Sequence, residues 1–312
     1  MNLRLDHFIS RLAFAGVVIL AACDVDYDLG DRNAEPRVVV NALLTPQEDF
    51  VVKLHWSTTY SGDKMKFRPV ENADIRLFEN GAEAFECAAS PDGETKTSFR
   101  AAAGRDYRLE IDVAGYGKLT ASTTIPEPPT AQLAATKEKG YYRHFELSTL
   151  DAPAEAKSIW IKGTETVDRG EYWENFPEGR YQVSDISEYY TTSPFVDQIN
   201  GVNDTYHAED KGSTVDFEEF LRIPYENREA VLPLRFSVWG SSGGMTKYSH
   251  SFRIITASDA YDRYMKSRYK QEQNSGWNGE GNPFIEQITV YSNIENGLGI
   301  FAGYNYHKTP EL

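Results

Sequence analysis

Hydrophobic and polar residues alternate along the chain, first between residues 36 and 126. In FVVKLHWS (50–57) one apolar face consists of Phe50, Val52, Leu54 and Trp56. The segments 72–79 and 105–113 repeat the pattern, and each is followed by a glycine-containing turn sequence. A period of two with one apolar face is typical of a half-buried strand. Short strands with glycine and proline turns predict an immunoglobulin-like β-sandwich over residues 36–126.

Residues 131–312 carry a second set of strand patterns, interrupted by one helical segment. In 258–273, apolar residues recur at helical spacing after Ser258, a suitable capping residue. The aromatic stripe of this helix is interpreted as a packing face, made of Tyr261, Tyr264, Met265, Arg268 and Tyr269. The expected strands cover residues 145–150, 157–167, 230–240, 247–258 and 285–293. We therefore expect a mainly all-β protein with two β-rich domains and one helix.

The boundary between these domains is expected at residues 127–130. The sequence PEPPT (126–130) contains three prolines within four residues. Proline-rich segments form stiff, extended connectors. The predicted second domain therefore starts at residue 131.

Residues 165–228 interrupt the second domain with a long acidic and aromatic stretch that lacks clear periodicity. Long irregular insertions in compact domains are often functional. We expect ligand or partner contacts here from Tyr172, Trp173, Phe176, Tyr189 and Tyr190. The alternative is that these aromatic residues cover a sheet face.

The N-terminus has the organisation of an export signal. An apolar stretch from Leu12 to Ala22 follows a basic region and leads into Cys23. This stretch is too short to span a bilayer, so residues 1–22 are predicted to be a signal peptide. Small residues before a cysteine resemble the lipobox of bacterial lipoproteins, which predicts lipidation at Cys23 and a polar tether over 23–35. The alternative is a plain signal peptide with an incidental cysteine.

Composition narrows the classes of function. The formal net charge of −15 disfavours binding to a phosphate backbone, which requires excess Lys and Arg, so no nucleic-acid partner is expected. The chain contains two cysteines. If Cys23 is lipidated, Cys87 has no disulfide partner and is expected to be a small buried hydrophobic residue.

No motif in the sequence demands catalysis or a metal. The six histidines are scattered without zinc-ligand spacing, and no nucleophile elbow or phosphate loop occurs. AEDKGSTVDFEEFL (208–221) imitates the end of a calcium-binding loop but lacks its first ligand and its central glycine. We therefore predict no catalytic residues, no metal site and no cofactor, and a protein that is not an enzyme.

The segment 282–305 (NPFIEQITVYSNIENGLGIFAGYN) carries the most specific resemblance. It is expected to form a strand from Ile285 to Tyr291, a turn at 293–297 and a closing strand with Leu298, Ile300, Ala302 and Tyr304 on one face. Together with PRVVVNALLTP (36–46) and TTIPEPP (123–129), it resembles the lipoprotein family called domain of unknown function 4249, found in Bacteroidetes-type outer membranes. The motif AGRDYRL (103–109) also resembles transthyretin-like sandwiches of secreted bacterial proteins.

This resemblance implies a location and a class of function. Genes of the family often neighbour genes of TonB-dependent receptors, which implies a non-enzymatic accessory or ligand-binding partner of such a transporter in nutrient uptake. The alternative is a surface structural or adhesion protein, and a hydrolase is the third candidate. Acidic residues after a lipidated cysteine can accompany export in these bacteria, so Asp24, Asp26 and Asp28 are interpreted as a surface-export signal, or else as a solvated tether. We expect a lipid-anchored outer-membrane protein that faces the cell surface.

Overall fold

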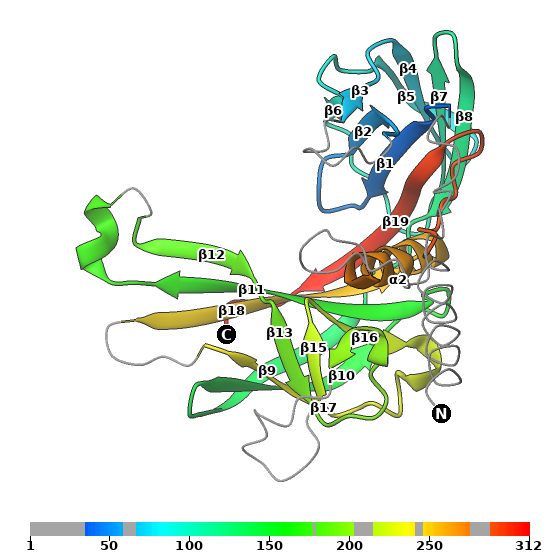
Figure 1. Ribbon diagram of the computed structural model, residues 1–312. Helices are drawn as coiled ribbons and strands as arrows, with labels where there is room; N and C mark the ends of the chain where they lie inside the picture. Colours follow the sequence, from blue (N-terminus) through cyan, green and yellow to red (C-terminus); the bar gives the residue numbers. More distant parts are fainter. Residues whose placement is uncertain (1–34, 59–66, 177–178, 203–214, 241–245, 275–287) are drawn as a thin grey trace, which may run out of the picture. The chain divides into compact units, whose positions relative to one another are not determined.

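The computed structural model describes residues 35–58, 67–176, 179–202, 215–240, 246–274 and 288–312. Over these residues the strands form three sheets, of nine, six and four strands (Figure 1). They are accompanied by the α-helix α2 (Asp259–Asn274) and by the short 3-10 helices η1 (Glu171–Asn175), η2 (Gln198–Asn200) and η3 (Tyr225–Asn227). The mainly β fold with one α-helix that the sequence predicts is confirmed over the described residues. None of the helices in this described part is long and apolar enough to span a membrane.

The nine-stranded sheet connects segments from both ends of the chain. Its strands, in spatial order, are β12 (Tyr181–Asp185), β11 (Ser158–Asp168), β18 (Lys247–Ala257), β19 (Leu298–Lys308), β1 (Val38–Leu44), β2 (Val51–Trp56) and β3 (Arg68–Pro69). Two short strands pair beside this path, namely β16 (Leu221–Pro224) with β11 and β6 (Glu94–Lys96) with β2.

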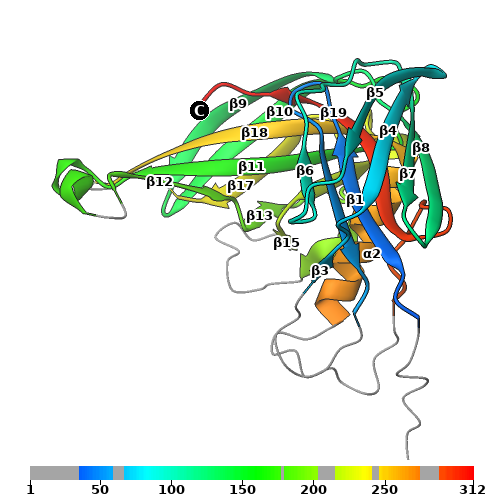
Figure 2. The same ribbon diagram turned by 90° about the horizontal axis from the view of Figure 1, so that it is seen from above.

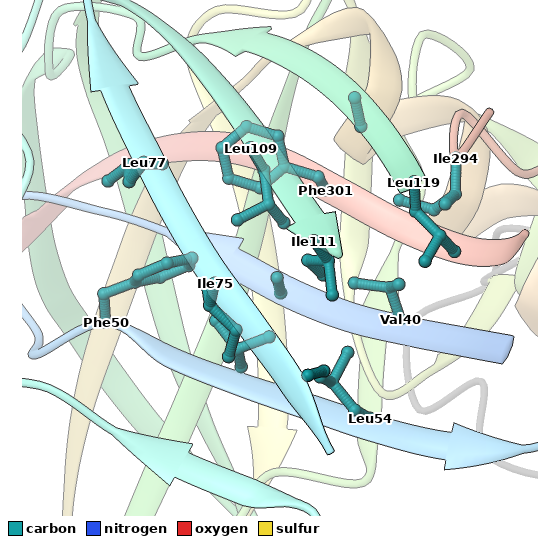
Figure 3. Close-up of a cluster of buried hydrophobic side chains, with 14 of the residues drawn as sticks. Val40, Phe50, Leu54, Ile75, Leu77, Leu109, Ile111, Leu119, Ile294 and Phe301 are labelled. Carbon is teal, nitrogen blue, oxygen red and sulfur yellow. The ribbon is translucent and has the colours of Figure 1, made fainter. Parts of the chain in front are cut away.

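The four-stranded sheet packs with β1, β2 and β19 to form the first hydrophobic core (Figure 3). Its strands are β5 (Ala82–Ala88), β4 (Ala73–Glu79), β7 (Asp106–Val113) and β8 (Gly117–Thr124). The residues predicted to face inward are buried, as Ile75, Leu77 and Leu109 illustrate. Full burial of such a side chain stabilises the fold by roughly 1.5–3 kcal/mol relative to exposure. This core accounts for the β-sandwich that the period-two pattern predicts.

The six-stranded sheet packs with β11, β16 and β18 to form the second core. Its strands are β14 (Gly201–Val202), β15 (Val215–Glu218), β13 (Glu188–Thr191), β17 (Leu234–Trp239), β10 (Tyr142–Asp151) and β9 (Thr130–Lys139). The third core lies under α2 and involves the opposite face of the same long strands. In β18, for example, Phe252 and Ile254 belong to the second core, whereas Ile255 and Ala257 belong to the third. Both faces of β18 are therefore buried in its C-terminal half.

Helix α2 follows its sequence signals. The Oγ atom of Ser258 accepts a hydrogen bond from the backbone N–H of Tyr261 at 3.2 Å, as expected for a capping residue. Tyr261 and Tyr269 are buried in the third core, and Tyr264 and Met265 pack against it. The interpretation of the aromatic stripe as a packing face is confirmed.

Strand β19 lies parallel to β1, although some 250 residues separate the two strands. Gly299, at φ 103°, makes this approach possible, since a Cβ atom there would stand 1.9 Å from the backbone oxygen of Val40. Phe301 on β19 and Ile294 before it belong to the first core. A segment predicted to lie in the second domain thus contributes a strand and two core side chains to the first sandwich.

The proline segment after β8 is fixed to the nine-stranded sheet. Asn305 Nδ2 donates a hydrogen bond to the Pro126 carbonyl at 2.9 Å, and Thr256 Oγ1 donates one to the Glu127 carbonyl at 2.7 Å. Asn305 and Thr256 are both buried. These bonds satisfy backbone acceptors of the segment in the protein interior.

Two sequence expectations differ from the structure. The strand expected at 285–293 is absent from its described part, residues 288–293. The side chain of Asn293 instead bonds both the N–H and the C=O of Phe301, which replaces strand pairing at that point. The region 165–228, expected to be irregular, contains the end of β11 and the strands β12 to β16. These strands have at most five residues each, too few to establish a periodic pattern.

Candidate functional site

The strands β11 and β18 extend beyond the six-stranded sheet that covers one of their faces. Along this face of β11, Ile159 and Ile161 are buried in the second core. The same face continues, two residues at a time, through Glu165 and Val167, which are only partly buried. β12 and β18 run beside β11 in this outer part (Figures 1 and 2). The face therefore changes from apolar and covered to polar and accessible along one strand.

A cleft of about 420 Å³ lies at this transition. It is lined by Glu165, Val167, Arg169, Gln182, Ser184, Trp239, Thr246 and Tyr248, which come from β11, β12, β17 and β18 or their ends. Small-molecule sites commonly occupy roughly 300–1,000 Å³ and carry a few placed polar groups. The cleft meets both criteria.

Glu165 and His250 lie side by side at this cleft. They are paired across β11 and β18, and His250 Nε2 stands 3.5 Å from Glu165 Oε2. His250 is fully buried, with its ring edge-to-face with Phe145 at 5.6 Å. Neither of its ring nitrogens makes a hydrogen bond to another described residue. Gly240, at φ 106°, leaves space beside them, because a Cβ atom there would stand 2.5 Å from Glu165 Oε2 and 3.3 Å from His250 Nε2.

Arg143 brings a further polar group to the same place. Its Nη1 donates to the Tyr248 carbonyl at 3.2 Å and stands 3.5 Å from a carboxylate oxygen of Glu138. Its Nε is buried and has no hydrogen-bond partner in the described part of the chain. A buried donor or acceptor without a partner costs about 1–3 kcal/mol. Arg143 and His250 do not line the cleft, but each contacts a residue that does, namely Tyr248 and Glu165.

An exposed aromatic pair adjoins the cleft. The ring of Trp239 stacks on Tyr141 with a centroid distance of 5.1 Å and an interplanar angle of 16°. Tyr142 meets the same indole edge-on at 5.7 Å. Trp239 remains 49% exposed and Tyr141 67% exposed. Stacking covers part of each ring, and the rest of this pair is an exposed aromatic surface beside the cleft that Trp239 lines.

The hairpin of β11 and β12 is stiffened by charges. Arg180 binds both carboxylate oxygens of Asp168, at 2.7 and 2.9 Å, and also contacts Glu174. Asp168 also accepts a hydrogen bond from the Gly170 N–H. Together, the bonds from Arg180 and Gly170 to this carboxylate lower the pKa of Asp168 to about 2. Arg169 additionally donates to the Gln182 side chain across the hairpin. The strands that carry one wall of the cleft are thereby held together.

The structure divides the predicted contact residues. Tyr189 and Tyr190 lie on β13 and are buried, and Tyr189 Oη accepts a hydrogen bond from the Gly163 N–H. Burial raises the pKa of Tyr189. Tyr172 and Phe176, by contrast, are exposed at the hairpin tip, with ring centroids 5.1 Å apart. Trp173 lies in η1 between them. Exposure at the tip is compatible with a contact role, which stays a prediction.

Other predicted positions are placed as follows. Cys23, Asp24, Asp26 and Asp28 lie outside the described residues, and so does the first half of the calcium-loop imitation. Cys87 is partly buried against the first core, and burial raises the pKa of its thiol. No group of three or more His, Cys, Asp or Glu side chains suited to a metal ion occurs in the described ranges.

Sequence reasoning missed Trp239, Glu165 and His250 as site residues. One signal for Trp239 was available, because Leu234, Phe236 and Val238 form the inward face of β17 and Trp239 falls out of phase with them. A tryptophan predicted on the outer side of a strand and followed by glycine is a candidate for contact. No local signal joins Glu165 to His250, since 85 residues separate them along the chain.

Comparisons with known proteins add similarities of different strength. No curated protein matches the chain. Among solved structures, it is similar to a protein from Bacteroides uniformis provisionally described as carbohydrate binding, with 14% identity, a TM-score of 0.15, and coverage of 71% of this chain and 89% of that one. It is also similar to the collagen-binding domain of the Erysipelothrix rhusiopathiae surface protein RspB, with 12% identity, a TM-score of 0.15, and coverage of 88% and 95%. Likenesses of this size carry no argument about the present chain.

The family comparison is of another kind, because it covers nearly the whole chain. The sequence pattern of the family described as Domain of unknown function (DUF4249) matches residues 23–309, starting at the cysteine that follows the apolar N-terminal stretch. The chain therefore belongs to this family.

Proposed function

We propose that this chain is a lipid-anchored outer-membrane protein that binds a ligand without transforming it and serves a TonB-dependent transporter as an accessory. The anchor rests on the lipobox-like sequence before Cys23. The transporter partnership rests on the family resemblance and its association with receptor genes. The binding role rests on the cleft between β11, β12, β17 and β18.

The cleft is the single observation that carries the binding role. It combines placed polar side chains with the half-exposed Trp239, and the buried His250 stands 3.5 Å from the Glu165 carboxylate that lines it. Glu165 is the one acid among the described residues that line it. Hydrolysis of a glycoside usually requires two carboxylates on either side of the bond to be broken. The arrangement favours binding over hydrolysis.

Purification from native outer membranes tests this function. The full chain with a C-terminal affinity tag is expressed in a host that processes its own lipoproteins, and membranes are dissolved under conditions that preserve known receptor complexes. We expect a TonB-dependent barrel receptor, identified by mass spectrometry, to co-purify with the chain. The matched control is Cys23→Ala, which should lose acylation, leave the outer membrane and no longer retain the receptor.

Two outcomes would contradict the proposal separately. If Cys23→Ala still incorporates labelled fatty acid and stays in the outer membrane, the lipid anchor is wrong. If the wild-type chain is anchored but no barrel co-purifies, the transporter partnership is wrong and the binding role is left without that partner.

A surface structural or adhesion protein is the second candidate, favoured by one observation. The β11–β12 hairpin exposes four large apolar side chains, those of Tyr172, Phe176, Tyr181 and Val183. Scattered exposed hydrophobic residues are ordinary, but a concentration of them on one hairpin is typical of a contact surface. Substitution of Tyr172 and Val183 by Ser should reduce attachment between cells if adhesion is the function, and should leave attachment unchanged if it is not.

A further inference from the structure

We propose that the cleft between β11, β12, β17 and β18 binds a neutral carbohydrate, with a sugar ring against the Trp239–Tyr141 surface and sugar hydroxyls bonded to Glu165 and its neighbours. This inference deepens the proposed function and rests on it, because it names the class of ligand that the anchored protein captures. It is carried by three observations: the aromatic surface, the balance of charge and the size of the cleft.

The aromatic surface matches the shape of a sugar ring. A pyranose presents a face of C–H groups that is apolar and nearly flat, and such a face packs well against an indole or phenol ring. Trp239 and Tyr141 are stacked on each other and about half or more exposed. Tyr142 packs edge-on against Trp239 and fixes the orientation of the indole. A ligand loses little free energy in ordering side chains that are already held in place.

The polar lining suits a ligand that carries hydroxyl groups and no net charge. A hydroxyl both donates and accepts hydrogen bonds, so it needs partners of both kinds. Glu165 offers acceptors and Gln182 offers a donor amide, while Arg169 donates to the Gln182 side chain and orients it. The ionised side chains lining the cleft in the described part are one carboxylate and one guanidinium, whose charges balance. A strongly anionic or cationic ligand would find no excess of opposite charge there.

Buried polar atoms without partners lie behind the cleft, next to residues that line it. Both nitrogens of His250 and the Nε of Arg143 are buried and unpaired among the described residues. Apart from them, Asn200 Oδ1 is the one other such side-chain atom in the described ranges. Groups of this kind are rare in native proteins and call for a specific explanation. A ligand hydroxyl in the cleft would meet Glu165, whose carboxylate oxygen stands 3.5 Å from the buried His250 Nε2.

Size and charge narrow the alternatives. A cleft of about 420 Å³ lies within the range of small-ligand sites and would hold about one or two sugar rings. A nucleotide base could also stack on Trp239, but the net charge of −15 opposes the approach of phosphates. A peptide is the remaining alternative and is included in the test.

The test uses the full-length lipoprotein, purified from outer membranes in a detergent without a sugar headgroup. The probes are immobilised neutral gluco-, galacto-, manno- and xylo-oligosaccharides, with sulfated and sialylated glycans and a peptide library for comparison. Affinity for the best neutral glycan is then measured by titration calorimetry. Trp239→Ala and the isosteric Glu165→Gln are the test variants. Phe67→Ala and Glu94→Gln, an exposed aromatic and an acidic substitution in the first sandwich, are the matched controls.

We expect at least one neutral glycan to bind, and each test variant to weaken this binding about tenfold or more, as removal of a central contact does. The two control variants should bind as the wild-type chain does. The inference is overturned if only acidic glycans or peptides bind, if nothing in the panel binds, or if Trp239→Ala and Glu165→Gln both leave neutral-glycan binding intact. Thermal unfolding of each variant checks its fold, and Glu165→Gln decides the matter if Trp239→Ala does not fold.

Failure of this inference is distinguishable from failure of the proposed function. Anchoring and co-purification of a receptor are measured on the same preparations. If the receptor co-purifies and no neutral glycan binds, the ligand class alone is wrong. If glycans bind in the cleft and no receptor co-purifies, the transporter partnership alone is wrong.

Discussion

Arg222 and His250 are both buried polar side chains on the nine-stranded sheet, but they lie on opposite faces and differ in their partners. Arg222 on β16 donates to both carboxylate oxygens of Asp262 on α2, at 2.8 Å each, and also contacts Asp197. Asp262 accepts further hydrogen bonds from Ser158 and from the Trp160 indole. The His250 ring, by contrast, makes no side-chain hydrogen bond within the described residues, and the Glu165 carboxylate stands 3.5 Å from its Nε2.

This difference in partners distinguishes side chains that stabilise the fold from side chains that belong to the candidate binding site. Breaking a buried ion pair by removing one partner leaves an uncompensated charge, so a fully paired cluster holds α2 on the sheet. A buried polar group without a hydrogen bond contributes no such pairing to the fold and calls for a specific explanation. The Arg222–Asp262 cluster is therefore interpreted as structural, and the His250–Glu165 pair as part of a binding site. Three predictions test this contrast.

The largest effect is expected from Asp262→Asn. The substitution leaves the buried Arg222 without its main counter-charge and should lower the free energy of unfolding by about 3–5 kcal/mol. Urea denaturation of the purified protein measures this quantity. Asp259→Asn is the matched control on the same helix, because Asp259 is exposed in its pair with Arg263 and should contribute at most about 1 kcal/mol. Equal losses of unfolding free energy in the two variants would show that the buried ion pair stabilises the fold no more than the exposed one.

The second effect is a pH dependence from the same carboxylate. Burial acts to raise the pKa of Asp262, but hydrogen bonds and charge from Arg222 and a hydrogen bond from Ser158 outweigh it, so the pKa lies below its ordinary value. A folded pKa below the unfolded value of about 3.9 means that the unfolded chain binds more protons in acid. This contribution to stability is complete above the unfolded pKa and is lost as the pH falls through the folded pKa.

Unfolding free energies measured from about pH 6 to pH 3 test whether stability falls with pH as expected. The wild-type chain should lose stability more steeply below about pH 4 than Asp262→Asn does. Parallel curves for the two proteins would mean that Asp262 is not the group responsible, and that its partners do not lower its pKa.

The smallest effect on the free energy of unfolding, an increase where Asp262→Asn gives a loss, is expected from His250→Leu. An apolar side chain removes two unpaired nitrogens and should leave the free energy of unfolding unchanged or raise it by about 1 kcal/mol. The same variant should bind neutral glycans more weakly. Phe252→Leu is the matched control, on the same strand and face, and should cost roughly 1 kcal/mol through lost packing. A loss of about 2 kcal/mol or more in His250→Leu would show that His250 has a structural partner.

Local signals predicted much of the fold because they act over a few residues. The pair Asn80–Gly81 adopts positive φ at both positions and connects β4 to β5, as its turn sequence indicates. The alternation of Ile75 and Leu77 identified a buried face correctly. The same reasoning failed at residues 288–293, where hydrogen bonds from a side chain replace strand pairing.

The candidate site shows where such reasoning ends. An aromatic-rich segment could be recognised, but periodicity did not reveal that Tyr189 is buried while Tyr172 is exposed. Tyr189 is held in the second core, where its hydroxyl accepts a hydrogen bond from the Gly163 N–H of β11. Such a pairing depends on which strands pack together, and no short stretch of sequence contains that information.

The sequence by itself determined most strand-forming segments, the cap of α2 and the family, because each depends on residues close together in the chain. Lipid attachment at Cys23 stays a prediction from the same kind of local signal. Only the tertiary structure decided that β19 lies beside β1 and that the six-stranded sheet ends before it covers Glu165. The physical reason is that side-chain packing between distant strands sets their pairing and the extent to which one sheet covers another. That uncovered edge places Glu165, His250 and Trp239 around one cleft.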